Sequence, residues 1–473
     1  MTDISALDLD NARPIAEAVF AECAHRLRLP SLAWGVVAGG KVVLGESTGD
    51  VYRIASMTKS FTCAALLTLR DEGRLVLDEP VSTYAPEFAG LSGPTADSPP
   101  ITVRHLMTMS SGLATDDAWA DRHLDMTDDD LDVYIAGGVV FAGVPGTAFE
   151  YSNLGFAILG RVVRNVTGAP VQRLVTDRLL GPLGMANTTW TEPRRAIPGY
   201  RERTGDGDEL ITEPSLGDGV MAPMGGLFTT VEDLAKWIGF LGGAFSGEAP
   251  GPASADEHAT PSPLSRASRR EMQQVSRVYF NQATASEPGH AGRDGGYGFG
   301  LNVVPHDRLG TVVTHSGGLP GFGSNMRWVP RLGIGVVALA NSTYAPMSTL
   351  TASTFDALVS GGAIRLPSLT PPDDVTAIAR RLIALLDDWS DETADEIFAD
   401  NMDLDEPRVQ RRAQAAELRA DHGPFTFARL ITESGASAIA VAHGPAAELR
   451  VDFLLAPTKP LRVQYFGTTT IIT

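Results

Sequence analysis

Strand-like segments stand at both ends of the first 366 residues, and a long helical stretch separates them. The first two, 32–37 and 41–46, are joined by Ala38-Gly39-Gly40, a glycine-rich turn typical of a hairpin. Apolar strand patterns return near the other end, at 298–304, 311–314, 323–329 and 333–340. The sequence therefore predicts an α/β fold in which one antiparallel sheet, flanked by helices and a helical subdomain, takes strands from both ends.

Two stretches interrupt this pattern. Residues 244–295 are rich in glycine, alanine, serine, proline and charge, which predicts a mobile surface insertion with one helical patch at 266–278. A proline-rich run at 366–372 marks a boundary. We expect a catalytic domain at 1–366 and a small C-terminal α+β domain at 371–473, lipocalin- or cystatin-like. Its helices are expected at 375–389, 391–399 and 408–420, and its strands at 425–431, 436–442, 449–455 and 461–472.

The composition narrows the class of partner. A net charge of −19 would repel nucleic acid and anionic membranes, so we expect neither as a partner. The N-terminal segment lacks the pattern of a secretory signal, and no apolar run has the length of a membrane helix, so we expect a cytoplasmic protein. The two cysteines, Cys23 and Cys63, and the scattered histidines have no metal-ligand spacing, so we expect no metal and no cofactor.

Ser56-Met57-Thr58-Lys59 places a hydroxyl and an amine three residues apart at the start of a predicted helix that ends at Gly73. Residues i and i+3 share a helix face, so Lys59 can reach the Ser56 oxygen. A partly desolvated lysine can lose its proton and activate a serine nucleophile. The pattern predicts a serine acyl-enzyme site if further partners follow it.

Tyr151-Ser152-Asn153 lies between a turn and a predicted helix. The Tyr151 phenol can exchange a proton with Ser56 or a leaving group, provided that a cation such as Lys59 lowers its pKa. The Asn153 amide can orient Lys59 and bind a substrate amide. The alternative is a purely structural pair, with Tyr151 in the core and Asn153 as a helix N-cap.

His315-Ser316-Gly317-Gly318 follows the predicted strand 311–314. Glycines on an edge strand let a ligand approach the backbone closely, and a backbone N–H there could complete an oxyanion hole with that of Ser56. A simple bulge or turn would also explain the glycines.

Together these three motifs resemble those of the serine β-lactamase and penicillin-binding-protein superfamily. The resemblance is greatest to the branch of class C enzymes, D-aminopeptidases, family VIII esterases and related acyltransferases. It covers about residues 10–365, and further family-like stretches occur at 105–113, 225–234 and 317–322.

The resemblance implies Ser56 as the nucleophile and Lys59 with Tyr151 as an acid/base pair, with the first base left open. Asn153 would line the cleft, and the amides of Ser56 and Gly318 would hold the oxyanion. Penicillin-recognising members usually carry Lys-Thr-Gly on this strand. Here His315 replaces that lysine, which makes efficient β-lactam hydrolysis doubtful, and His315 could instead hydrogen-bond Tyr151.

Three hypotheses about the substrate are compatible with this chemistry. They are a D-specific peptidase or amidase, a carboxylesterase, and a stand-alone thioesterase of penicillin-binding-protein type. The last would take a nonribosomal peptide from a peptidyl carrier protein and release it as a macrocycle. We favour it on compartment and architecture. The C-terminal module could cover the cleft, and Arg450 or Arg462 could reach the substrate end or be ordinary exposed strand residues. The acidic stretches Thr115-Asp116-Asp117 and Asp128-Asp129-Asp130 would either attract an amine terminus or form a solvated face. An inactive sensor with the same fold is a further alternative.

Overall fold

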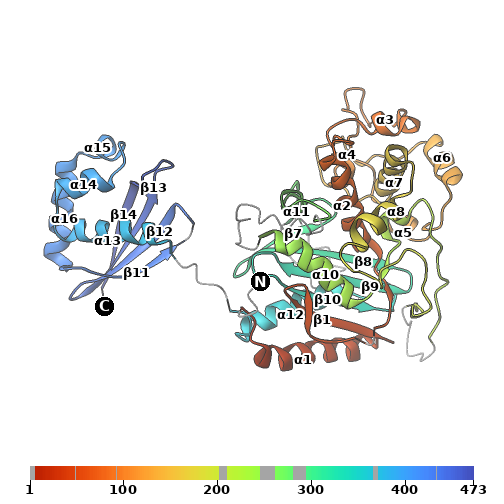
Figure 1. The fold of residues 1–473 in the computed structure, drawn as a ribbon, viewed down its shortest axis with the longest axis horizontal. Helices are drawn as coiled ribbons and strands as arrows, with labels where there is room; N and C mark the ends of the chain where they lie inside the picture. The colour runs from red at the N-terminus through yellow and green to blue at the C-terminus, as the bar shows by residue number, and fades with distance from the viewer. Residues whose placement is uncertain are drawn as a thin grey trace, which may run out of the picture. The chain divides into compact units, whose positions relative to one another are not determined.

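The computed structural model describes residues 6–47, 49–91, 93–201, 210–245, 262–280, 295–365, 371–432 and 434–472. The chain divides into two compact units, Met1–Leu366 and Pro367–Thr473 (Figure 1). Within the described ranges, no helix has both the length and the apolar character needed to cross a membrane.

The first unit is built on an eight-stranded antiparallel sheet with the order β2-β1-β10-β9-β8-β7-β6-β5. β1 and β10 pair along their whole length, from Leu32 opposite Ala340 to Ala38 opposite Ile334. This pairing confirms the predicted sheet with strands from both ends. The strands are β1 (Leu32–Ala38), β2 (Lys41–Glu46), β5 (Arg277–Tyr279), β6 (Gly295–Tyr297), β7 (Asn302–His306), β8 (Gly310–Leu319), β9 (Phe322–Val329) and β10 (Ile334–Ala340).

Both faces of this sheet are covered, and alternate strand residues supply two separate cores. Trp34 and Val36 of β1 face the core formed with α1 (Leu9–Leu27) and α12 (Met347–Ser360), where Phe20 stacks on Trp34 at 4.3 Å between ring centroids. Ala33 and Val37 face the opposite core, with α10 (Val231–Gly242) and the helical subdomain. A sheet buried on both faces explains why its strands read as continuous apolar runs.

The helical subdomain surrounds α2 (Thr58–Asp71), whose first twelve residues, Thr58–Leu69, are all buried. α7 (Leu154–Thr167) packs beside it and is buried on all sides over 155–159 and 161–163. The other elements of this region are β3 (Tyr52–Arg53), η2 (Ala55–Met57), α3 (Val81–Tyr84), η3 (Pro86–Phe88), α4 (Val103–Met107), α5 (Asp117–Ala120), α6 (Asp128–Ala136), α8 (Val171–Val175), η4 (Thr176–Leu180), α9 (Ala222–Gly225), β4 (Phe228–Thr229), η5 (Gly243–Phe245) and α11 (Arg266–Met272).

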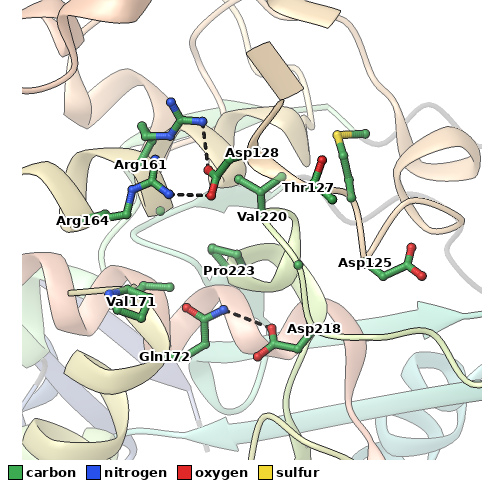
Figure 2. A pocket seen from close by; sticks show the side chains of 14 residues that line it. Asp125, Thr127, Asp128, Arg161, Arg164, Val171, Gln172, Asp218, Val220 and Pro223 are labelled. Carbon is green, nitrogen blue, oxygen red and sulfur yellow. Dashed lines mark hydrogen bonds and ion pairs between the residues drawn. The ribbon is translucent and has the colours of Figure 1, made fainter. Parts of the chain in front are cut away.

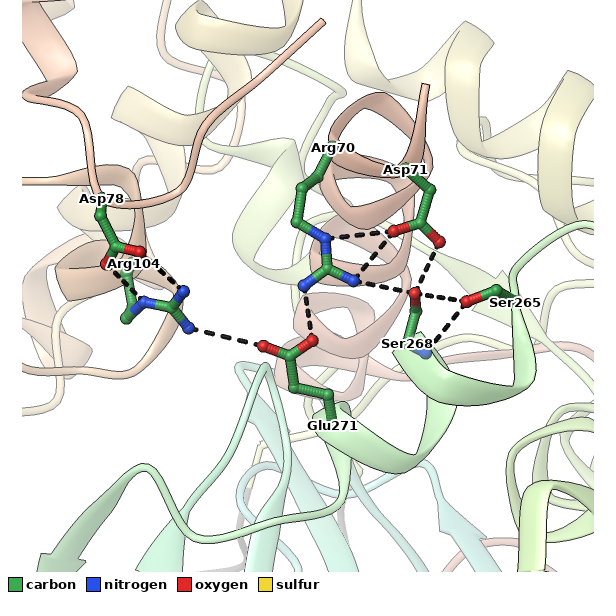
Figure 3. Close-up of polar contacts among 7 residues, drawn as sticks. All are labelled: Arg70, Asp71, Asp78, Arg104, Ser265, Ser268 and Glu271. Carbon is green, nitrogen blue, oxygen red and sulfur yellow. Dashed lines mark hydrogen bonds and ion pairs between the residues drawn. The ribbon is translucent and has the colours of Figure 1, made fainter. Parts of the chain in front are cut away.

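The predicted insertion contains a segment that packs firmly on the domain. Glu271 of α11 pairs with Arg70 of α2 at 2.5 Å and with Arg104 of α4 at 3.6 Å (Figure 3). Ser268 donates a 2.5 Å hydrogen bond to Asp71, and Met272 is fully buried. Residues 262–280 therefore belong to the packed domain, whereas 246–261 and 281–294 lie outside the described residues. The helix also ends earlier than predicted, and Arg277–Tyr279 forms the strand β5 at the end of the sheet.

The second unit is a four-stranded antiparallel meander, β11-β12-β13-β14, with helices on one face. Along β13 the buried residues alternate with more exposed ones, so only one face of the sheet carries the core. The likeness to lipocalins or cystatins stays a prediction. The elements are α13 (Asp373–Asp387), α14 (Asp391–Ile397), α15 (Met402–Asp405), α16 (Arg408–His422), β11 (Thr426–Thr432), β12 (Ser437–His443), β13 (Ala447–Leu455) and β14 (Val463–Ile472).

Candidate active site

Ser56 lies on a tight turn that leads directly into the buried helix α2. Its neighbour Ala55 has φ of +50°, in the left-handed region that non-glycine residues rarely adopt. Backbone strain of this kind clusters at functional sites, because the surrounding structure has to hold it in place. Ser56 itself is 8% exposed, so its hydroxyl sits in a confined position at the start of the helix.

Lys59 is fully buried and lies one helical turn after Ser56. Its Nζ donates to Ser56 Oγ at 2.9 Å, to Asn153 Oδ1 at 2.6 Å and to the carbonyl oxygen of Met224 at 2.9 Å. A neutral amine has two N–H groups and one lone pair. It can therefore keep the bonds to Asn153 and Met224 while its lone pair takes the proton of Ser56. Met224 was not singled out from the sequence, because a backbone carbonyl leaves no side-chain signal.

The environment of Lys59 favours the neutral amine. Burial lowers its pKa to about 8, because the charged form loses its hydration. The carboxylates of Asp117, Asp121 and Asp116 act in the opposite direction and keep the pKa from falling further. The amine is therefore partly unprotonated near neutral pH, as a general base has to be.

Asn153 stands at the N-cap position of α7, but its side chain makes no capping bond. Asp116 caps the helix instead, with Oδ1 accepting from the Asn153 N–H at 2.7 Å and Oδ2 from the Leu154 N–H at 2.8 Å. The Asn153 amide is thereby left to contact Lys59. This arrangement supports the orienting interpretation of Asn153 over the structural one.

Tyr151 is partly buried beside Lys59, with its ring centroid 5.0 Å from Lys59 Nζ. Its pKa is raised well above the ordinary value, mainly by burial and then by the negative charge of Asp117, while its interaction with Ser56 acts in the opposite direction. The condition that a cation such as Lys59 lowers this pKa is therefore not met, because burial dominates. Tyr151 is a neutral phenol that can donate a proton.

His315 is also buried at the site, but it does not bond to Tyr151 as expected. Its Nδ1 lies 2.6 Å from the carbonyl oxygen of Ser316, and its Nε2 lies 3.0 Å from the hydroxyl of Tyr297. A carbonyl can only accept, so Nδ1 carries the proton and Nε2 accepts from Tyr297. Burial, followed by the Lys59 charge, lowers the pKa of His315 to about 3.

Tyr297 was missed by the sequence reasoning. It is fully buried, and its ring packs edge-on against the rings of Tyr151 and His315. The signal in the sequence is an aromatic residue set within Gly295-Gly296-Tyr297-Gly298, at the end of a stretch interpreted as an insertion.

Gly317 and Gly318 bring β8 close to the Ser56 turn. A Cβ on Gly317 would lie 2.0 Å from the carbonyl oxygen of Ile54, and one on Gly318 would lie 2.7 Å from the ring of Tyr344. β7 pairs with β8 only as far as Thr314, and within the described residues no strand pairs with this edge of β8 beyond that point. The oxyanion role of the Gly318 amide stays a prediction.

Gly317→Ala is expected to lower the free energy of unfolding by about 1–3 kcal/mol, because the added methyl group overlaps the Ile54 carbonyl. The control is Gly90→Ala, where nothing lies within 4 Å of the added Cβ. Urea unfolding of both variants measures the difference. Equal stability of the two variants would show that the Ser56 turn shifts at no cost.

A cavity of about 350 Å³ lies beside α7 and is distinct from this site (Figure 2). Arg161 and Arg164 both pair with Asp128 on its wall, and Gln172 binds Asp218. Its lining contains none of the residues predicted for catalysis.

The two arginines proposed for the C-terminal module are bound within their own unit. Arg462 donates to the carbonyl oxygens of Asp395 and Phe398, and Arg450 pairs with Glu448 at 2.9 Å. Within the described ranges, no group of three or more His, Cys, Asp or Glu side chains is placed to hold a metal ion.

Comparison with known proteins places this arrangement in a family. A family model described as Beta-lactamase matches residues 16–360. Protein flp of Staphylococcus aureus (strain MW2) is 32% identical over 232 residues, which are 45% of this chain and 45% of that protein. D-alanyl-D-alanine-carboxypeptidase/endopeptidase AmpH of Escherichia coli (strain K12) is 31% identical over 197 residues, 40% of this chain and 48% of that protein. The chain thus spans less than half the length of these curated relatives.

Two solved structures share the fold. The octameric penicillin-binding protein homologue from Pyrococcus abyssi has a TM-score of 0.57 at 20% identity, over 97% of this chain and 90% of that one. A D-stereospecific amidohydrolase from Streptomyces sp. has a TM-score of 0.56 at 24% identity, over 74% and 98%. The match of the family model to residues 16–360 shows that the chain belongs to the β-lactamase family, in the class C-like branch of the serine β-lactamase and penicillin-binding-protein superfamily.

Proposed function

We propose that this protein is a serine acyl-transfer enzyme that acts on peptides at a D-configured residue, through an acyl-enzyme on Ser56. The observation that carries the proposal is the buried Lys59 amine, 2.9 Å from Ser56 Oγ and held by Asn153. A hydroxyl beside a desolvated amine at the start of a helix is the arrangement that an activated serine nucleophile needs.

In the first half of the reaction, Ser56 Oγ attacks the acyl carbon while its proton moves to Lys59. The opposite shifts of the Lys59 and Tyr151 pKa values support Lys59 over Tyr151 as this first base. The pKa of Lys59 is lowered to about 8, whereas that of Tyr151 is raised, so the phenol keeps its proton. Backbone N–H groups of Ser56 and Gly318 would hold the negative oxygen of the tetrahedral intermediate.

The leaving group then departs with a proton from Tyr151, which recovers one from Lys59. An ester now links the acyl group to Ser56. In the second half, water or an amine attacks this ester, and the same two groups carry the protons in reverse. Water yields a free acid, and an amine yields a new amide.

The charges around Ser56 support a donor without a carboxylate next to the scissile bond. His315, which stands where penicillin-recognising enzymes usually have a lysine, is neutral because its pKa is lowered to about 3. The carboxylates of Asp116 and Asp117 act on Lys59 and would repel an anionic donor. Burial raises the pKa of Asp121 to about 7, so this third group is partly protonated near neutral pH and contributes less negative charge. The printed names of two relatives, a D-alanyl-D-alanine-carboxypeptidase/endopeptidase and a D-stereospecific amidohydrolase, support a peptide or amide with a D-residue. Of the two activities in the first name, the endopeptidase activity is the one that fits a donor without a carboxylate next to the scissile bond.

A second candidate is release of a carrier-bound nonribosomal peptide as a macrocycle. A thioester donor also lacks a carboxylate next to its scissile bond, so it suits the same site, where His315 supplies no positive charge. The separate α+β unit at Pro367–Thr473 supports this candidate, because the thioesterases that the sequence resembles carry such a module. Hydrolysis of a carboxylic ester is the remaining candidate activity.

Mass spectrometry with matched donors tests the proposal. The protein is incubated with a peptide amide, a peptide methyl ester and a peptidyl N-acetylcysteamine thioester, each ending in D-Ala or L-Ala. We expect a covalent adduct on Ser56, a preference for the D-series, and linear acid from the amide and the thioester. Ser56→Ala is the control and should form no adduct. A cyclic product from the thioester would select the macrocyclase, turnover of the methyl ester alone would select an esterase, and the lack of any adduct would overturn acyl transfer.

A further inference from the structure

We propose that Asp116 and Asp117 are positioning residues for acyl transfer. They fix the amide of Asn153 so that its oxygen, not its nitrogen, holds the Lys59 amine beside Ser56. The inference rests on the proposed function of Ser56 and Lys59, and it adds two residues that were first interpreted as an amine-binding or solvated acidic stretch.

The side-chain amide of Asn153 has two donors and one acceptor oxygen. Nδ2 donates to Asp117 Oδ1 at 2.7 Å and, more weakly, to Asp116 Oδ1 at 3.3 Å. Both acceptors are carboxylate oxygens, so a flipped amide would place its oxygen against them. The unflipped amide is the one that presents Oδ1 to Lys59 Nζ at 2.6 Å.

Asp116 also fixes the backbone on which Asn153 stands. Its carboxylate receives the N–H groups of Asn153 and Leu154 at the start of α7, where unpaired donors and the helix dipole favour a negative charge. Asn153 is fully buried, so its position follows that of the helix end. The Asp116 carboxylate therefore sets the position of Asn153, and the Asp117 carboxylate sets the orientation of its amide.

Asp117 has a second effect, through its charge. Of the groups that raise the pKa of Lys59 it is the strongest, ahead of Asp121, Asp116 and Cys63. The other titratable side chains that interact with this lysine are Tyr151 and His315, which are neutral, as is Tyr297 behind them. Removing the Asp117 charge should therefore move the pKa of Lys59 downward, and the free base should appear at lower pH.

Two variants separate the hydrogen bond from the charge. Asp117→Asn keeps an oxygen that can accept from Asn153 but removes the charge, whereas Asp117→Ala removes both. Asp117 is exposed, so neither change disturbs the core. Asp129→Ala, at an exposed aspartate on α6, is the matched control. The measurement is the rate of Ser56 labelling by a fluorophosphonate probe across pH 5.5–9.5.

We expect both Asp117 variants to shift the rising limb of the rate profile to lower pH. We also expect Asp117→Ala alone to lose about tenfold in the rate at high pH, because a misplaced Lys59 costs orientation. An Asp117→Ala plateau equal to that of wild type would overturn the positioning role, wherever its limb lies, while leaving acyl transfer intact. A wild-type protein that takes no label would instead overturn the proposed function, so the two failures are distinct.

Discussion

Lys59→Met is expected to slow the acylation of Ser56 by about 10³-fold at pH 8. The methionine side chain has a similar length and fits the buried position, but it has no lone pair of sufficient basicity to accept the Ser56 proton. Asn153 Oδ1 and the Met224 carbonyl would lose their shared donor, so a stability loss of about 1–3 kcal/mol should accompany the change. Fluorophosphonate labelling and urea unfolding measure the two effects separately.

The pH dependence gives the same experiment a second readout. The base has to be unprotonated, so the wild-type rate should rise with pH, about tenfold per unit, and level off above the Lys59 pKa of about 8. The rate for Lys59→Met should not show this rise with pH. Lys41→Met, at an exposed lysine on the β1–β2 hairpin, should behave as wild type. A rising limb that persists in Lys59→Met would assign the base to another group.

Tyr151→Phe is expected to lower turnover of a peptide amide by about 10²-fold or more. The raised pKa of Tyr151 means that the phenol is protonated at the reaction pH, so the variant loses an acid for the leaving amine. An activated nitrophenyl ester has a leaving group that departs without a proton. We therefore expect a much smaller loss with that ester, measured by the ratio of kcat/KM for the two substrates.

The control for Tyr151→Phe is Tyr134→Phe, at an exposed tyrosine on α6, which should leave both rates unchanged. Equal losses on amide and ester would argue against a role in leaving-group departure. Near-normal turnover of both substrates would remove Tyr151 from the mechanism altogether.

The predicted strands that pair at the two ends of the first unit could be found from the sequence because their apolar runs are strong local signals. We predicted their pairing because strands stand at both ends with helices between them, and β1 against β10 confirms it. The structure of the segment after residue 266 was harder to predict from the sequence. Its short helix carries mostly polar residues, and it is held by pairs such as Arg70–Glu271 that join positions far apart in the chain. Such pairs leave no local pattern.

In the candidate site, too, some contacts could be predicted from the sequence and others could not. Ser56 and Lys59 stand one turn apart on a helix, so their contact follows from local geometry and could be predicted. The partners of His315 could not, because Tyr297 comes from another strand. The raised pKa of Tyr151 could not be predicted either, since a sequence lists the nearby cation but not the extent of burial.

From the sequence we could predict the contact of Ser56 with Lys59 and the pairing of the sheet, because the first rests on short-range spacing and the second on apolar periodicity. The protonation of Lys59, Tyr151 and His315 depends on the tertiary structure, because desolvation by the groups packed around each side chain shifts its pKa. The tertiary structure also places Asp116 against the backbone N–H of Asn153 and Asp117 against its side-chain Nδ2.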